Sequence, residues 1–276
     1  MKNMIQTWQI TQTENLKLEL NASTLDEVTQ RLPEGYYSTF RTFDGGTRVL
    51  GFASHLERLY QPVAAPEVDE PSLRRQLSTL LELYRPGEAR VRAIMTKQGQ
   101  VYVSTAPLSI LPHEVYEKGV HVETTGLQRK HPRLKSTSFI GRSDSERKHI
   151  AQEGIFEALL VRDGEILEGM TSNFFYAGQV KGLPYIGTAR DKILLGITRD
   201  TVLNIARGRG LTVKYQPLKL DQLEQVSEAF ITSSSRGVVP VVQIDEVTIG
   251  QGGPGPITRD LVTAYEAHVL EVAEKI

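Results

Sequence analysis

The sequence predicts a mixed α/β protein of the α+β type that is built from two domains. At 276 residues the chain is long enough for two hydrophobic cores. Its hydrophobic share of 39% and its charged share of 24% are ordinary for a globular protein. Segments with the period of a strand and segments with the period of a helix occur in both halves of the chain. We therefore expect helices and a sheet in each domain.

The charge balance and the composition exclude several classes of function. The formal net charge is −1 and no basic block stands out, which argues against nucleic acid or an anionic membrane as the main partner. The chain contains no cysteine and its six histidines show no metal-binding spacing, so no metal site is predicted. Because neither a signal-peptide core nor a long apolar run is present, we expect a soluble, cytoplasmic protein.

Residues 1–110 are predicted to form a smaller, N-terminal α+β domain. The aromatic and β-branched run at 35–43 predicts a strand, and the Asp-Gly-Gly that follows predicts a hairpin turn. A second hairpin is expected around the Gln-Gly-Gln at 98–100. Helical periodicity predicts three helices, over 22–32 with Ser23 or Thr24 as its cap, over 54–61 and over 71–84.

Residues 111–119 mix Pro, Gly and charged residues, and they are the predicted linker to a larger C-terminal domain at 120–276. In that domain the turn Asp163-Gly164 predicts a hairpin, and a helix is expected to begin at Thr198. Further strands are predicted near 120–127, 172–178, 211–218, 228–235 and 238–245, and an amphipathic helix is predicted over 256–276.

Two stretches of the second domain have features of an anion site. In GITRD, residues 196–200, a glycine and a hydroxyl residue stand at a helix start, where free backbone N–H groups bind anions such as phosphate. In ITSSSRGVVP, residues 231–240, three serines at a strand end supply a second group of donors. A plain capped helix and a polar turn are the alternatives. Arg236 either pairs with a substrate carboxylate or is a solvated charge.

A third stretch, EILEGMTSNFFYAG at 165–178, places Glu168 where an apolar strand meets a glycine. A carboxylate held against an apolar wall keeps a ring nitrogen protonated, because the ion pair is favoured where water is scarce. A lone glutamate near a turn would carry no such meaning. The interpretation therefore depends on the combination of Glu168 with the other stretches.

Together these stretches resemble the class IV aminotransferases, pyridoxal-phosphate (PLP) enzymes of the branched-chain and D-amino-acid aminotransferase type. The resemblance implies the two-domain D-amino-acid aminotransferase-like fold, which is fold type IV of PLP enzymes, and a homodimer. The implied reaction moves an amino group between an amino acid and a 2-oxo acid. Elimination of pyruvate by a 4-amino-4-deoxychorismate lyase is the alternative. The motifs that match in order and approximate spacing are HLERL, LKSTS, EALLVRDGEILEGMTSNFF, ILLGITRD and EAFITSSSRGVVPV.

By the same resemblance Lys135 forms the Schiff base with the cofactor and moves the substrate α-proton as general base and acid. Glu168 is implied as the partner of the pyridine nitrogen. Tyr37 and Glu157 match positions that line the substrate pocket. The remaining implied cofactor-binding residues are Arg58, Ile197, Thr198 and Ser234 for the phosphate and Leu194 for the ring face.

The chain departs from the family pattern in three places. Ser38 follows Tyr37 where a glutamate is usual, and Ile140 stands where the branched-chain enzymes carry a tyrosine. The tight hairpin at 95–103 lacks the Arg-x-His pair with which D-amino-acid enzymes hold the substrate carboxylate. Another cation has to pair with that carboxylate, because an unpaired buried charge is very costly. The two candidates are Arg41 and Arg236, each with a surface or dimer salt bridge as the alternative role.

Overall fold

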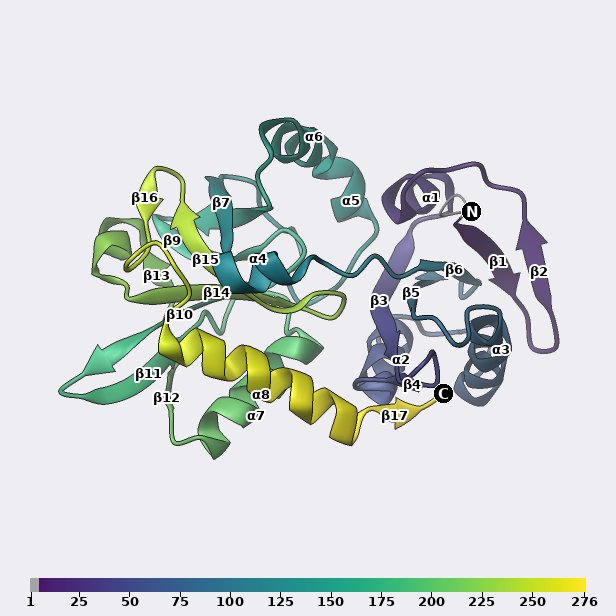
Figure 1. The fold of residues 1–276 in the computed structure, drawn as a ribbon. Helices are drawn as coiled ribbons and strands as arrows, with labels where there is room; N and C mark the ends of the chain where they lie inside the picture. Colours follow the sequence, from purple (N-terminus) through teal and green to yellow (C-terminus); the bar gives the residue numbers. More distant parts are fainter. Residues whose placement is uncertain (1–4) are drawn as a thin grey trace. The chain divides into compact units, whose positions relative to one another are not determined.

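The computed structural model describes residues 5–276, and these residues form two compact units (Figure 1). The first unit contains the chain up to Ser109 together with Leu134–Arg142 and Val269–Ile276. The second unit contains Ile110–Arg133 and Ser143–His268. The two later segments of the first unit lie inside the region predicted as the C-terminal domain. They join the first unit because each one adds backbone hydrogen bonds to its sheet.

The first unit is built on a seven-stranded sheet with the strand order β17-β4-β3-β5-β6-β1-β2. Its strands are β1 Gln6–Ile10, β2 Asn15–Leu18, β3 Gly35–Phe43, β4 Arg48–Val49, β5 Ala89–Thr96, β6 Val101–Pro107 and β17 Glu274–Lys275. Its helices are α1 Leu25–Arg31, α2 Phe52–Tyr60, α3 Glu70–Glu82 and α5 Ser138–Arg142. The helices and the hairpins predicted for the first half are therefore present.

One face of β3 supports the core of the first unit. Phe40 of β3 belongs to the same buried cluster as Leu56 of α2 and Leu77 of α3. Because side chains alternate along a strand, the even-numbered residues of β3 face this core. The odd-numbered residues, Tyr37 and Arg41 among them, lie on the opposite face.

The second unit is built on a ten-stranded sheet with the order β12-β11-β10-β14-β15-β7-β8-β9-β13 and with β16 beside β15. Its strands are β7 Val120–Thr125, β8 Glu157–Arg162, β9 Glu165–Gly169, β10 Asn173–Val180, β11 Leu183–Gly187, β12 Thr212–Lys214, β13 Leu218–Lys219, β14 Glu228–Ser233, β15 Gly237–Ile244 and β16 Val247–Thr248. Its helices are α4 His113–Lys118, α6 Asp144–Glu153, α7 Ile197–Gly208, the 3-10 helix η1 Leu220–Gln225 and α8 Pro256–Val272, which ends in the first unit.

The second sheet closes on itself, and the closure brings Glu168 beside Asn173. Strand β10 pairs with β14, and its first residue Asn173 also pairs with Glu168 of β9. Strands β10, β14, β15, β7, β8 and β9 therefore form a closed ring. The β8–β9 turn at Asp163-Gly164 has positive φ angles of 55° and 74°, which confirms the two-residue hairpin predicted there.

Three elements differ from the expected boundaries. Residues 113–118 of the predicted linker form helix α4, because its apolar side packs on the core of the second unit. Helix α7 begins after its N-cap Gly196, so Thr198 lies inside the first turn instead of before it. The C-terminal helix ends at Val272, and Glu274–Lys275 forms a strand beside β4.

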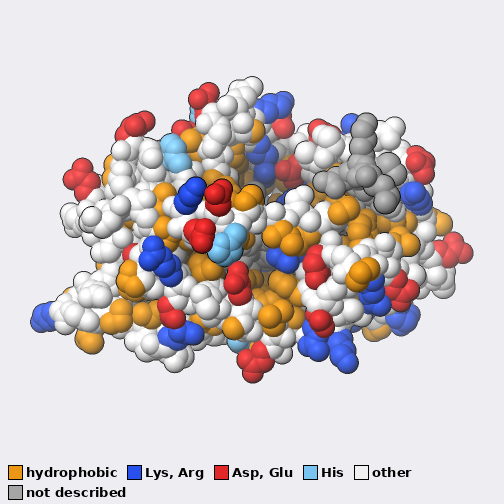
Figure 2. All heavy atoms as spheres, in the orientation of Figure 1, with side chains coloured by type: hydrophobic (Ala, Val, Ile, Leu, Met, Phe, Trp, Pro, Cys, Tyr) orange, Lys and Arg blue, Asp and Glu red, His pale blue; other side chains and the backbone are white. Residues whose placement is uncertain are grey.

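The surface carries charges of both signs. Figure 2 shows acidic and basic side chains interspersed with apolar ones on the visible face. None of the helices in the described part of the chain has the length and the apolar character needed to cross a bilayer. Within residues 5–276, no group of three or more His, Cys, Asp or Glu side chains is placed to hold a metal ion.

Candidate active site

In the first unit the segment that carries Lys135 pairs with the start of β3. The Tyr37 N–H donates to the Lys135 carbonyl at 2.9 Å, and the Thr137 N–H donates to the Gly35 carbonyl at 2.9 Å. Only glycine fits at position 35, because a Cβ there would lie 2.1 Å from the Met95 carbonyl oxygen. This pairing holds Lys135 beside Tyr37, and the Lys135 Nζ lies 5.0 Å from the centroid of the Tyr37 ring.

A buried histidine lies close to the same lysine. Nδ1 of His55, on α2, lies 2.7 Å from the Ser38 hydroxyl of β3. Burial holds the pKa of His55 well below its usual value, and the positive charges of Arg58 and Lys135 lower it further. Lys135 therefore lies beside Tyr37, and both Lys135 and Arg58 are near enough to His55 to lower its pKa.

His55 is expected to make the stability of the protein depend on pH. An unfolded histidine takes up a proton below about pH 6.5, whereas folded His55 resists protonation to a lower pH. The contribution of neutral His55 to the free energy of unfolding is therefore complete above about pH 6.5. It decreases as the pH falls toward the folded-state pKa, by up to about 1.4 kcal/mol per pH unit.

Urea unfolding at a series of pH values from neutral to mildly acidic measures this dependence. His55→Gln is expected to make the free energy of unfolding depend less on pH in the acidic range. The reason is that the glutamine amide bonds to Ser38 without taking up a proton. His113→Gln is the matched control, since His113 is an exposed histidine of α4. Equal slopes for wild type and His55→Gln would show that His55 is not held neutral.

Arg41 is not brought to this lysine. It stands four residues beyond Tyr37 on β3, which corresponds to roughly 13 Å along a strand. Its guanidinium carbon lies 4.5 Å from the centroid of Phe43, and its Nε donates to the Thr42 carbonyl at 3.3 Å. The side chain is therefore directed toward the far end of β3.

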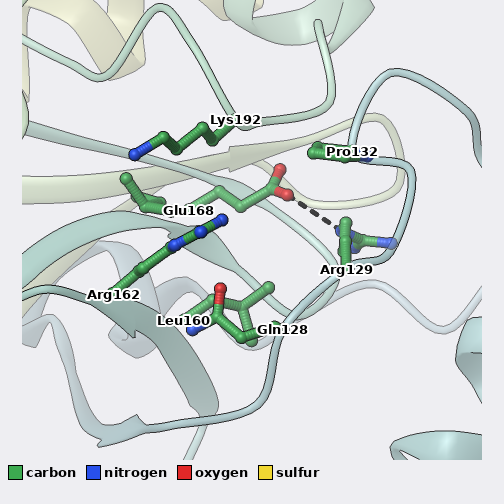
Figure 3. Close-up of a pocket in the computed structure, with 8 residues that line it drawn as sticks. Gln128, Arg129, Pro132, Leu160, Arg162, Glu168 and Lys192 are labelled. Atoms are coloured by element: carbon green, nitrogen blue, oxygen red, sulfur yellow. Dashed lines mark hydrogen bonds and ion pairs between the residues drawn. The ribbon is translucent and has the colours of Figure 1, made fainter.

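In the second unit Glu168 is buried and bonded at both carboxylate oxygens. Its side chain is 2% exposed, and its Oε1 lies 2.8 Å from Arg129 Nε. Figure 3 marks this ion pair with a dashed line. Oε2 of Glu168 accepts the Leu194 N–H at 3.0 Å. Asn173 also binds the backbone of Leu194, since its Nδ2 donates to the Leu194 carbonyl at 2.8 Å. Glu168 and Leu194 are thus brought together, and the direction of the carboxylate is fixed.

The start of α7 offers free N–H groups. Its N-cap Gly196 has no side chain, and no side-chain cap hydrogen bond occurs there among the described residues. Thr198 is buried, and its hydroxyl donates at 3.5 Å to Ser234 Oγ in the turn between β14 and β15. Ile197, Thr198 and Ser234 therefore gather at one helix terminus, and such a terminus attracts anions.

Arg236 lies in the same turn and is paired with a buried glutamate. Its Nη2 lies 2.8 Å from Glu157 Oε2, and the two side chains are 22% and 2% exposed. The Thr171 hydroxyl bridges the pair, because it donates to Glu157 and accepts from Arg236. The guanidinium carbon lies 4.9 Å from the centroid of Phe156. Glu157 and Arg236 are thus brought together, and part of the guanidinium remains exposed.

Two buried hydroxyl groups flank Asn173 and have no hydrogen-bond partner among the described residues. They are Ser172 Oγ and Thr232 Oγ1. Ser172 precedes Asn173 in the chain, and Thr232 pairs with Asn173 across β10 and β14. Because buried polar groups in native proteins are nearly always bonded, each of these hydroxyls needs a partner such as an ordered water or a bound group.

Each unit contains groups of the kind that a charged cofactor needs. In the second unit a buried carboxylate is suited to a protonated ring nitrogen, and the uncapped start of α7 is suited to a phosphate. In the first unit Lys135 lies beside Tyr37.

Comparison with known proteins gives the family. The family model described as amino-transferase class IV matches residues 35–244. The D-alanine aminotransferase of Bacillus licheniformis is 31% identical over 263 residues, which cover 88% of this chain and 90% of that protein. The chain therefore belongs to the class IV aminotransferase family, whose enzymes use PLP.

Solved structures share the fold over nearly the whole chain. A hypothetical aminotransferase from Mycobacterium tuberculosis in its PLP-bound form has a TM-score of 0.76 and 22% identity, covering 96% of this chain and 99% of its own. A branched-chain aminotransferase from the archaeon Thermoproteus uzoniensis with norvaline has a TM-score of 0.72 and 22% identity, covering 96% and 95%. These structures confirm the predicted D-amino-acid aminotransferase-like fold of fold type IV.

The sequence patterns indicate no role for Arg129, Asn173 or His55. Arg129 stands in an irregular loop, and its partner Glu168 is 39 residues further along the chain, so no local spacing connects them. His55 was part of the motif HLERL. Its position between apolar residues on one helical face was the available signal that it would be buried.

Proposed function

We propose that this PLP-dependent aminotransferase binds its cofactor covalently through Lys135 and uses Glu168 as the partner of the ring nitrogen. The observation that carries this proposal is the buried Glu168, whose Oε2 accepts the Leu194 N–H at 3.0 Å. A carboxylate bonded in this way in a dry site is directed and ionised, as the partner of a protonated ring nitrogen has to be. Leu194, whose N–H donates to this carboxylate, is proposed to pack on the face of the cofactor ring.

The residues present fit the cofactor. A phosphate dianion suits the uncapped start of α7 with Ile197 and Thr198, and Ser234 adds a hydroxyl. Arg58 is proposed to add a charge-assisted contact from the first unit. The buried hydroxyls of Ser172 and Thr232 need a partner, which a bound group would supply.

When bound, PLP supplies an electron sink for the charge left behind when the substrate α-proton is removed. Lys135 is proposed to take up that proton at Nζ and to return it to the neighbouring position of the adduct. Its amine works in this role only while it is unprotonated. Tyr37, 5.0 Å from Nζ, limits the directions that the amine can take.

For the substrate carboxylate we favour Arg236 over Arg41. The guanidinium of Arg236 is partly exposed beside the turn that contains Ser234, whereas Arg41 is directed toward Phe43. Glu157 orients Arg236, since the ion pair and the Thr171 hydroxyl fix its Nη2. A buried carboxylate needs such a charged partner.

The relatives are aminotransferases, and they do not favour the lyase alternative that the sequence left open.

A homodimer and a cytoplasmic location remain proposals. The family resemblance supports the dimer. Light scattering of the cofactor-loaded protein tests the dimer, and a monomer mass at full activity would contradict it.

Borohydride reduction tests the role of Lys135. Reduction of the PLP-loaded protein followed by peptide mass spectrometry is expected to place the cofactor on Lys135. Lys148 and Lys192 are internal controls, since both are exposed lysines within the same half of the chain. An adduct on either control, or no adduct at all, would contradict the assignment.

A further inference from the structure

Arg129 is a buried cation in direct contact with Glu168. It stands in the loop that follows β7, its side chain is 5% exposed, and its Nε lies 2.8 Å from Glu168 Oε1. Its Nη2 donates to the Met170 carbonyl at 2.7 Å. Because a guanidinium is planar, these contacts fix its orientation toward the carboxylate.

The other cations around Glu168 are more exposed than Arg129. A cavity of about 10 Å³, the size of one water molecule, is lined by Glu168, Arg129, Arg162 and Lys192 (Figure 3). Arg162 is half exposed and lies 3.6 Å from Asp163, and Lys192 is exposed. Water screens these two charges, whereas the contact of Arg129 is dry and therefore stronger. Among these three cations, Arg129 is the buried one and is in direct contact with Glu168.

The loop of Arg129 leads into Lys135. The loop belongs to the second unit, and the chain enters the first unit at Leu134. Gln128, Arg129 and Arg133 each donate to a backbone carbonyl of the second unit, at 2.6, 2.7 and 3.0 Å. Arg129 therefore holds both Glu168 and the stretch of chain that precedes the lysine.

We propose that Arg129 is a positioning residue that keeps the proton shared by Glu168 and the cofactor on the ring nitrogen. This role rests on the proposed function, in which Glu168 faces that nitrogen. The charge of Arg129 stabilises the ionised carboxylate, so the proton stays on the nitrogen. Without that charge the same proton moves to Glu168, and the ring loses the positive charge that makes it an electron sink.

Nitrogen-15 NMR of protein loaded with ring-labelled PLP reports where the proton lies, independently of turnover. Wild type and Arg129→Lys are expected to show a protonated ring nitrogen, because both keep the charge. Arg129→Gln is expected to show an unprotonated one, with kcat lower by at least about tenfold and KM changed by less than about twofold. Arg162→Gln is the matched control on the same cavity, and it is expected to behave as wild type.

A protonated ring nitrogen in Arg129→Gln would overturn the role of Arg129. Urea unfolding of the cofactor-free variants establishes that each is folded. If Arg129→Gln is not, Arg129→Met supplies a second neutral side chain of similar length, with the same expected and contradicting results. A wild-type protein that takes up no PLP would contradict the proposed function itself. Normal uptake by wild type with a protonated nitrogen in the neutral variants would contradict the role of Arg129 alone.

Discussion

Replacing Glu168 with alanine is expected to lower the free energy of unfolding of the cofactor-free protein by about 3–5 kcal/mol. The substitution removes one member of an ion pair whose side chains are 5% and 2% exposed, so the charge of Arg129 stays buried without its carboxylate. The Leu194 N–H also loses its acceptor, which adds the cost of an unsatisfied buried donor. Both effects act in the apo protein and do not depend on PLP.

Urea unfolding of the cofactor-free protein measures this loss. Glu165→Ala is the matched control on the same strand, because Glu165 is less buried and is expected to change the stability by less than about 0.5 kcal/mol. The double variant Glu168→Leu with Arg129→Met is expected to lose less than Glu168→Ala, since it leaves no unpaired charge behind. Wild-type stability for Glu168→Ala would show that the pair does not hold this part of the sheet.

The sequence predicted the elements whose signals are local. Asp163-Gly164 has the residues that a two-residue hairpin needs, and the structure has positive φ at both. The alternation in 35–43 predicts both β3 and its two faces, because a strand has a period of two. The sequence predicts that α7 begins at Thr198, whereas in the structure Gly196 is the N-cap and Ile197 is the first helical residue. Helix starts are assigned within such margins.

The sequence could not predict pairings between distant segments. The segment of Lys135 was assigned to the C-terminal domain by its place in the chain, but it hydrogen-bonds to β3. The contact of Arg129 with Glu168 depends on the β9–β10 closure, which no local pattern encodes. In residues 111–119, Pro and Gly predict a loop, but packing on the second core overrides that tendency and stabilises α4.

The contacts of Arg236 also depend on distant segments, and they lead to the second prediction. Arg236→Ala is expected to lower kcat/KM for the best 2-oxo acid, mainly by raising KM. The ratio of the two kcat/KM values is expected to correspond to a loss of about 2–4 kcal/mol of transition-state stabilisation. The reason is that the substrate carboxylate would lose its charged partner in a site closed from water. Arg41→Ala is the matched control, because the guanidinium of Arg41 lies over Phe43 at the far end of β3. It is expected to keep kcat/KM within about twofold of wild type.

A structural role for Arg236 has to be separated from substrate binding, because its removal also leaves the buried Glu157 without its ion-pair partner. Double substitution of Arg236→Ala with Glu157→Gln removes that unpaired charge, so it is expected to restore stability in urea but not kcat/KM. Titration of the variant with PLP distinguishes the two roles in a second way. If Arg236 binds the substrate carboxylate, its substitution is expected to leave the affinity for PLP nearly unchanged. If the double variant recovers kcat/KM, or if Arg236→Ala weakens PLP binding as much as it lowers kcat/KM, Arg236 supports the site without binding the substrate. A loss in Arg41→Ala alone would instead assign the carboxylate to the first unit, against the direction in which that side chain lies.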